Sequence, residues 1–361
     1  MKIAAAKAVS GFLLLALIMV GTAAPVVAQG DYEVIPVSLE TGERIRLNYA
    51  LKPGETIAGG LLVKNNSAEP INLLICSLDA HTSGTGETAF PAIDSVSSEM
   101  GKWLNISESE ITLGVGESQQ LEFTLSLPTD IAPGEYYGGI VSQKAEPTSL
   151  EAGERMTVIQ VIRRVQTVYV VVPGPLQSSL EVASIKQVWD GTDIAFKVEL
   201  RNTGNVAVSP QGKLDVSDAS GKLIGSFPFK SGRILARDTI VLLVRPGGVL
   251  PPGEYCASVK GSYSCSNADV ERIAELLGDA AAVSPELASI KTIALAVDFT
   301  ISGEAIREKA KEAAEEGLVP WTEVTTAPFN LLLIISIAAG VLIVGMAILL
   351  VVLLRRRRGE T

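Results

Sequence analysis

Residues 118–127 read SQQLEFTLSL, and residues 133–136 read Pro133-Gly134-Glu135-Tyr136. Apolar and polar residues alternate along the whole first stretch, which is the period of a β-strand with one buried face. The second stretch indicates a turn, because Pro and Gly interrupt regular pairing. The combination recurs, since Pro252-Gly253-Glu254-Tyr255 also follows an apolar strand that ends in Leu-Pro. The sequence therefore predicts two copies of one antiparallel β unit.

Further runs of the same kind extend the pattern in both directions along the chain. The runs are bounded by Gly, Pro and Asn, and they lie at 44–51, 56–64, 71–78, 155–172, 180–189, 193–201, 213–217, 223–229, 239–245 and 290–301. The segment 155–172 is longer than a typical strand, so we expect it to bend or to pass between sheets. Strands at this spacing predict an all-β region of two immunoglobulin-like β-sandwiches in tandem, at 29–174 and 175–301.

The repeated turn gives a structural role to several residues. Tyr136 and Tyr255 lie near the start of the penultimate strand of each predicted sandwich, where a tyrosine corner ties the strand to its loop. In each copy a Pro-Gly pair forms the turn before the tyrosine, Pro133-Gly134 in the first and Pro252-Gly253 in the second. We expect these residues to support the fold and not to contact a ligand.

Two segments depart from the β pattern. Residues 267–289 are rich in Ala, Leu and Glu at helical spacing, which predicts a small helical insertion whose helix ends at Gly278. Residues 302–328 are predicted to form a juxtamembrane helix and linker, with Ser302 as the N-cap of a helix that runs to Glu316.

The N-terminus has the pattern of a secretory signal peptide at 1–28. Lys2 and Lys7 precede an apolar run, and the small residues that follow favour cleavage after Ala28. An earlier cleavage site at residues 22–24 and a retained N-terminal anchor are the alternatives. We therefore expect the chain to be exported.

The C-terminus is predicted to cross a membrane once. Residues 329–354 are 26 residues without a formal charge, which give about 39 Å of helix, enough for a tilted span. Four cations follow at once, and by the positive-inside rule they orient the short tail 355–361 toward the cytoplasm: Arg355, Arg356, Arg357 and Arg358. A buried core helix is the alternative. We expect a single-pass protein of the cell membrane with its sandwiches outside.

Composition excludes several function classes. The net charge is −10, and it becomes −15 for the predicted exterior once the six cations and one acid of the two ends are set aside. An acidic surface of this kind disfavours nucleic acid as a partner. His81 is the single histidine of the chain, which leaves zinc sites and histidine-based catalysis with almost no ligands or bases. We therefore predict no cofactor, no metal site and no catalytic residues.

The three cysteines would lie in an oxidising compartment. Cys256 and Cys265 are symmetric about Lys260-Gly261, so a two-residue turn there would place them opposite each other and allow a disulfide. A continuous strand would instead keep the two sulfurs far apart as free thiols. Cys76 lies in an apolar run and is expected to be a buried thiol. Asn65 and Asn105 match the acceptor pattern for N-glycosylation, which matters in a host that glycosylates.

The first half of the chain resembles the peptidoglycan-binding domain of the WxL-interacting protein family. The resemblance covers most of 32–173, and its motifs are Lys52-Pro53-Gly54, Asn65-Asn66-Ser67, Trp103-Leu104, residues 113–117 and residues 133–140. The second half, 176–301, is similar to the family's host-binding domain in outline, with the insertion at 267–289 as a departure. The resemblance implies a membrane-anchored adaptor that binds a wall polymer and WxL-type partners, and it transfers no binding residue.

Two functions follow as expectations. The first is a non-catalytic, membrane-anchored surface binding or scaffold protein, which contacts cell-wall polymer or surface proteins through its sandwiches and lipid through its span. The alternative is an envelope carbohydrate-active enzyme, or an accessory subunit of a membrane complex, that works through carboxylates the sequence cannot group in space.

Overall fold

The computed structural model describes residues 31–146, 148–151, 157–247, 250–278 and 283–315. The predicted signal peptide with Ala28, the predicted span at 329–354 and the four arginines at 355–358 lie outside the described residues. Within the described ranges, no helix is long and apolar enough to cross a membrane. The described chain is an all-β protein with immunoglobulin-like sandwiches and a few short helices.

The first sandwich packs a four-stranded sheet against a five-stranded sheet. The first sheet has the order β1 (Tyr32–Val37), β3 (Thr56–Asn65), β9 (Ser118–Ser126) and β7 (Leu104–Ile106). The second has the order β2 (Asn48–Ala50), β13 (Arg163–Val172), β10 (Gly134–Lys144), β4 (Ile71–Asp79) and β8 (Glu110–Leu113). Neighbouring strands are antiparallel except β2, which runs parallel to β13. The alternation along β9 places Leu121, Phe123 and Leu125 in the core between the sheets, each at most 1% exposed.

Short elements decorate this sandwich. They are the hairpin of β5 (His81–Thr82) and β6 (Thr88–Ala89), the single turn α2 (Met100–Trp103), and the ribbon of β11 (Thr148–Glu151) and β12 (Thr157–Gln160). The segment predicted as one long bent strand at 155–172 is thus two strands, β12 and β13, separated by Val161 and Ile162. The run at 44–51 forms a strand only over its last part, as β2.

The second sandwich packs three strands against four. The first sheet has the order β14 (Leu180–Asp190), β15 (Asp193–Asn202) and β18 (Thr239–Val244). The second has the order β17 (Leu223–Lys230), β16 (Ser209–Asp218), β19 (Gly253–Ser264) and β20 (Lys291–Ile301). The helical elements are α3 (Asn267–Leu277), the 3-10 turn η2 (Pro285–Ala288) and α4 (Gly303–Glu315). Gly278 ends α3 with a φ of 68°, and the Ser302 hydroxyl accepts from the Ala305 amide at the start of α4.

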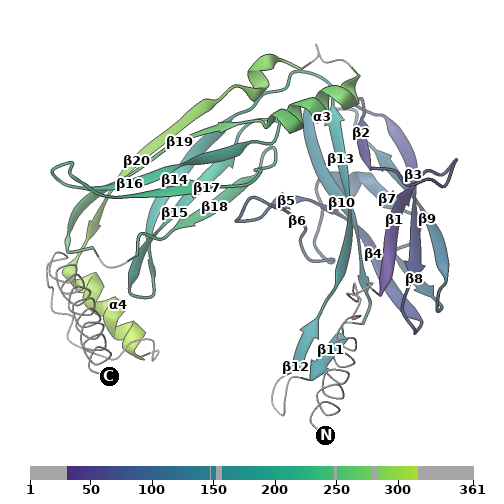
Figure 1. Ribbon diagram of the computed structural model, residues 1–361, viewed down its shortest axis with the longest axis horizontal. Helices are drawn as coiled ribbons and strands as arrows, with labels where there is room; N and C mark the ends of the chain where they lie inside the picture. The colour runs from purple at the N-terminus through teal and green to yellow at the C-terminus, as the bar shows by residue number, and fades with distance from the viewer. Residues whose placement is uncertain (1–30, 147, 152–156, 248–249, 279–282, 316–361) are drawn as a thin grey trace, which may run out of the picture.

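The two sandwiches stand as the arms of an arch, with α3 where the arms meet (Figure 1). No described strand of the first sandwich pairs with a strand of the second.

Each arm contains a buried asparagine whose side chain bonds several loop carbonyls. Asn65 donates to the carbonyls of Glu69, Leu113 and Gly114, and Asn202 donates to three carbonyls of its own domain in the same manner. Because its amide is fully buried and bonded, Asn65 is not available as a glycan acceptor in the folded chain, whereas Asn105 is exposed.

The hypothesis of a disulfide between Cys256 and Cys265 is wrong in this structure, where all three described cysteines are free thiols. The expected turn at Lys260-Gly261 does not form, because β19 runs unbroken from Gly253 to Ser264. Gly261 lies directly opposite Gly212 of β16, and a Cβ on Gly212 would come within 2.7 Å of the Gly261 Cα. The glycine is therefore needed for a close approach of two central strands and not for a turn.

Candidate functional site at the junction of the two sandwiches

The turn residues of the repeated motif lie where the sequence predicts, at the base of long strands. The Tyr136 hydroxyl donates to the Ala132 carbonyl at 2.8 Å, and the Tyr255 hydroxyl donates to the Pro251 carbonyl at 2.7 Å. Both are contacts of a tyrosine with a carbonyl four residues upstream, which is the geometry of a tyrosine corner. The tyrosine contact is thus the same in both copies.

The Pro-Gly pairs of the two copies differ in their surroundings. Gly134 has a φ of 142°, and a Cβ on it would lie 2.7 Å from the Asn205 carbonyl oxygen of the other sandwich. The side-chain amide of Asn205 also donates to the carbonyl of Pro133. Pro252-Gly253 makes no such interdomain contact among the described residues, and Gly253 is not among the described glycines with positive φ. The first copy therefore forms part of the domain junction.

Glu135 is the centre of this junction, and its side chain is fully buried. One carboxylate oxygen accepts from the Tyr137 hydroxyl at 2.8 Å and from the Tyr169 hydroxyl at 2.7 Å. The other accepts from the backbone amide of Ala207, which belongs to the second sandwich. A buried carboxylate is costly unless it is paired and hydrogen-bonded, and these donors supply both requirements together with Arg272.

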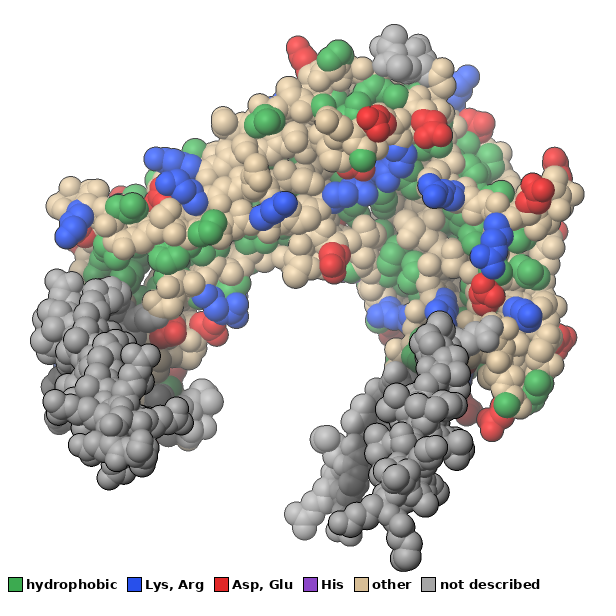
Figure 2. Space-filling model, viewed as in Figure 1, with side chains coloured by type: hydrophobic (Ala, Val, Ile, Leu, Met, Phe, Trp, Pro, Cys, Tyr) green, Lys and Arg blue, Asp and Glu red, His purple; other side chains and the backbone are tan. Residues whose placement is uncertain are grey.

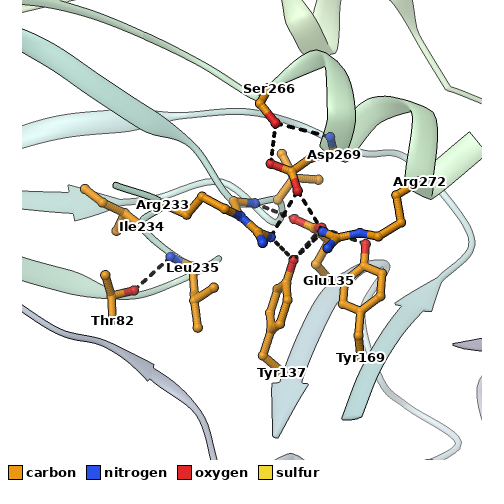
Figure 3. A network of polar contacts seen from close by, with 12 residues as sticks. Thr82, Glu135, Tyr137, Tyr169, Arg233, Ile234, Leu235, Ser266, Asp269 and Arg272 are labelled. Carbon is orange, nitrogen blue, oxygen red and sulfur yellow. Dashed lines mark hydrogen bonds and ion pairs between the residues drawn. The ribbon is translucent and has the colours of Figure 1, made fainter. Parts of the chain in front are cut away.

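Two arginines of the second sandwich complete the network (Figure 3). Arg272, on α3, lies 3.3 Å from the Glu135 carboxylate and 2.8 Å from Asp269, and its guanidinium stacks 4.1 Å from the centre of the Tyr169 ring. Arg233 pairs with Asp269 at 3.2 Å and also donates to the Tyr137 hydroxyl. Two carboxylates and two guanidiniums therefore balance each other in a largely buried space.

The start of α3 is fixed by the same residues. The Ser266 side chain is the N-cap and accepts from the Asp269 amide at 3.1 Å, while its hydroxyl donates to the Asp269 carboxylate at 2.7 Å. The Ser266 hydroxyl thus caps the helix and also holds the carboxylate of the residue whose amide it accepts from. It orients the Asp269 carboxylate toward both arginines, so the helix insertion and the domain junction form one unit.

The two tyrosines at Glu135 act as hydrogen-bond donors over the whole physiological range. Burial, reinforced by the neighbouring Glu135 charge, raises the pKa of Tyr137 well above its ordinary value of 10. The same two causes raise the pKa of Tyr169. Both hydroxyls therefore keep their protons and donate them to the carboxylate.

The β5–β6 hairpin of the first sandwich forms a second set of contacts across the junction. The Thr82 backbone amide and hydroxyl donate to the Asp238 carboxylate at 2.6 and 2.7 Å. The Thr82 hydroxyl in turn accepts from the Leu235 amide at 2.9 Å. Gly86 and Gly232 touch so closely that a Cβ on Gly232 would lie 2.3 Å from the Gly86 carbonyl oxygen. The hairpin therefore packs closely against the second sandwich and is hydrogen-bonded to it.

Arg237 joins the two sets of contacts. Its guanidinium lies 4.1 Å from the centre of the Tyr136 ring and donates to the Glu135 carbonyl at 2.9 Å. It is the single described non-glycine residue with a positive φ, 67°. An L-residue adopts this conformation at an energetic cost, so the surrounding contacts must hold it there. Figure 2 shows Lys and Arg side chains gathered on the surface where the arms meet.

Most of this site was not foreseen from the sequence. The sequence pattern assigns no role to the residues of the network, because they are spread over the chain and come together only when the arms meet: Glu135, Tyr137, Tyr169, Arg233, Asp269 and Arg272. Glu135 gives a partial signal, because it is a charge at the start of an otherwise apolar strand.

His81 is exposed at the start of the β5–β6 hairpin and lies outside the network. Among the described residues, no group of three or more His, Cys, Asp or Glu side chains is placed to hold a metal ion.

Comparisons with known proteins identify no family. No protein-family model matches the chain, and no curated protein matches it. Similar solved structures include a chaperone–tip adhesin complex of CFA/I fimbriae biogenesis, with 12% identity over 73% of this chain and 98% of that chain and a TM-score of 0.31. Another is the CsuC–CsuE pre-assembly complex of the Csu pili of Acinetobacter baumannii, with 12% identity, 73% and 97% coverage and a TM-score of 0.34. Likenesses at these TM-scores carry no argument about what this chain does.

Proposed function

We propose that this chain is a non-catalytic, membrane-anchored cell-surface protein whose two sandwiches act as one rigid scaffold for binding. The observation that carries the proposal is the buried Glu135 network, which fixes the two arms to each other. Domains of one chain usually move relative to each other unless the interface between them is extensive. Here, opening the joint would remove the contacts of Glu135 with Arg272 and with the Ala207 amide.

A rigid arrangement of the two sandwiches favours binding of a partner. A surface that is already ordered before binding loses less conformational entropy when a partner docks. The network and the β5–β6 hairpin join the two arms through two sets of contacts, one at Glu135 and one at Thr82. This supports a protein that presents a fixed surface to a large partner rather than one that closes around a small substrate.

The buried carboxylates of the junction join the two sandwiches and are not arranged for catalysis. Glu135 and Asp269 are the two buried carboxylates among the described residues, and Arg272 contacts both. The remaining donors to Glu135 are two tyrosines and a backbone amide. With every oxygen engaged by the protein itself, this pair is not positioned as the acid and base of a glycoside hydrolase.

Two parts of the proposal, the membrane anchor and the kind of partner, are supported by features of the sequence. The uncharged stretch at 329–354 and the arginines that follow it support a single span with the sandwiches outside. The motifs shared with the WxL-interacting protein family support a wall polymer or a WxL-type surface protein as the partner. In this proposal α4 joins the second sandwich to the span.

The proposal is tested by retention of envelope material on the immobilised full chain in mild detergent. We expect a wall-polymer or surface-protein fraction to be retained, and less of it by a Glu135→Gln variant whose joint is loosened. Glu254→Gln, at the equivalent and exposed position of the second motif copy, is the matched control. Failure of the wild-type chain to retain any envelope fraction would refute the binding role.

A further inference from the structure

The strand β18 has an unusual sequence for the edge of a sheet. Its six residues, Thr239–Val244, read TIVLLV and contain no charge, no Pro and no Gly. Among the described strands β18 pairs with β15 alone, so its other side is an unpaired edge. A neutral aliphatic strand at an edge can pair with another chain. The edge strand of the opposite sheet, β17, is protected from such pairing, because it contains Pro228, Lys230 and a bulge.

The free hydrogen-bonding groups of this edge belong to every second residue of β18. The Asp238 carbonyl accepts from the Asn202 amide of β15, and in an antiparallel pair alternate residues from there on bond to the same neighbour. The backbone groups of Thr239, Val241 and Leu243 therefore point away from β15. Val241 and Leu243 are also 47% and 39% exposed, and their side chains lie on the same face of the sheet. The edge thus offers both free backbone groups and apolar side chains.

The β5–β6 hairpin of the first sandwich covers the first part of this edge. Thr82 donates twice to the Asp238 carboxylate, immediately before β18. A Cβ on Gly84 would lie 3.9 Å from the Val241 carbonyl oxygen, which is one of the free acceptors. Figure 1 shows the hairpin reaching from the first arm toward β18. The hairpin forms no strand pairing with β18, so it covers the edge without extending the sheet, and the covered part is continuous with the domain junction.

We propose that β18 is a self-association surface that the β5–β6 hairpin keeps covered, and that β18 of a second copy of this chain binds there when the hairpin leaves. Antiparallel pairing about a two-fold axis at Leu242 places Val241 of each copy opposite Leu243 of the other, so that free backbone groups bond to free backbone groups. The exposed side chains of the two copies then cover each other. Because the predicted exterior has a net charge of −15, a neutral strand is also where two copies repel each other least.

The experiment measures the mass of the full chain in mild detergent by light scattering at increasing protein concentration. Thr82→Ala removes the hydroxyl that bonds Asp238, and loss of a hydrogen bond to a carboxylate should raise the uncovered population about tenfold or more. In a second variant an Asn-Gly turn replaces residues 83–86, which shortens the hairpin and uncovers the edge outright. We expect wild type to stay monomeric and both variants to approach the mass of two chains. Thr88→Ala is the matched control, because Thr88 is exposed and lies opposite Thr82 in the same hairpin.

A lysine on β18 identifies the surface through which the copies associate. Val241→Lys or Leu243→Lys, added to the short-hairpin variant, should restore the monomer, because pairing would bring like charges together. Ile290→Lys, at an aliphatic residue that is 78% exposed elsewhere, should leave the dimer intact. A short-hairpin variant that stays monomeric would overturn the inference. Association that neither β18 lysine reverses, or that Ile290→Lys reverses equally well, would overturn it too, because the contact would then lie outside β18.

Discussion

Replacing Glu135 by Gln keeps the shape of the side chain and removes its charge. The carboxylate accepts hydrogen bonds from two tyrosines, one backbone amide and Arg272, and a carboxamide can accept on only one of its two terminal atoms. Removing one charge of a buried pair typically costs about 3–5 kcal/mol. Arg272 keeps its contact with Asp269 at 2.8 Å, so we expect the lower end, about 3 kcal/mol.

The assay is urea unfolding of the full chain followed by circular dichroism. With a slope of about 2 kcal/mol per molar urea, a loss of about 3 kcal/mol lowers the midpoint by about 1.5 M. The matched control is Glu254→Gln, which changes the same residue of the repeated motif at an exposed position and should stay within about 0.5 kcal/mol of wild type. Because the network joins the arms, the variant should also be cleaved more readily by protease in the segment between the two sandwiches. Equal midpoints for the two variants would refute the assignment of Glu135 as the joint.

Four further outcomes are expected. Tyr255→Phe removes the bond to the carbonyl four residues upstream and should cost about 1 kcal/mol in the same titration; no change would contradict a tyrosine corner. Gly232→Ala places a Cβ 2.3 Å from the Gly86 carbonyl oxygen, and should destabilise the chain by about 1–3 kcal/mol unless the hairpin is not seated as described. Without reductant, intact mass should show three labelled thiols in denaturant, and in the folded chain Cys256 should react long before the buried Cys265. Burial, with nearby acidic charge, raises the pKa of Cys265 to about 12. The stability that the protonated thiol contributes is therefore complete below pH 9 and is lost between pH 9 and 12. Cys265→Ala should flatten that part of the pH–stability curve, and an unchanged slope would count against this assignment.

The strands with one solvated face were predictable, because their side chains obey a strict period. β9 is an example, with Leu121, Phe123 and Leu125 inside and polar residues between them. Prediction failed at β19, where Lys260-Gly261 has the composition of a turn. The glycine instead allows close contact with Gly212 of the next strand, a requirement that only the pairing of distant segments creates.

The candidate site was less accessible to sequence reasoning than the fold. Its members lie on β10, β13, the segment before β18 and the first two turns of α3, and they are ordinary residues individually. The helix insertion at 267–289 was predicted as a departure from the β pattern, yet its role was not. In the structure it supplies Asp269 and Arg272, and Arg272 pairs both with Asp269 and, across the junction, with Glu135.

The two motif copies show how one local requirement can support two different roles. Both copies need Pro-Gly and Tyr to turn the chain and tie the corner, and both tyrosines make the same backbone contact. The glutamate between them has no part in that contact, so it is free to differ in function. In the second copy Glu254 is exposed to solvent, whereas in the first copy Glu135 is fully buried against the neighbouring domain. The arch is therefore built from a repeated corner, and the buried network that joins its arms is centred on a residue of that corner that the tyrosine contact does not need.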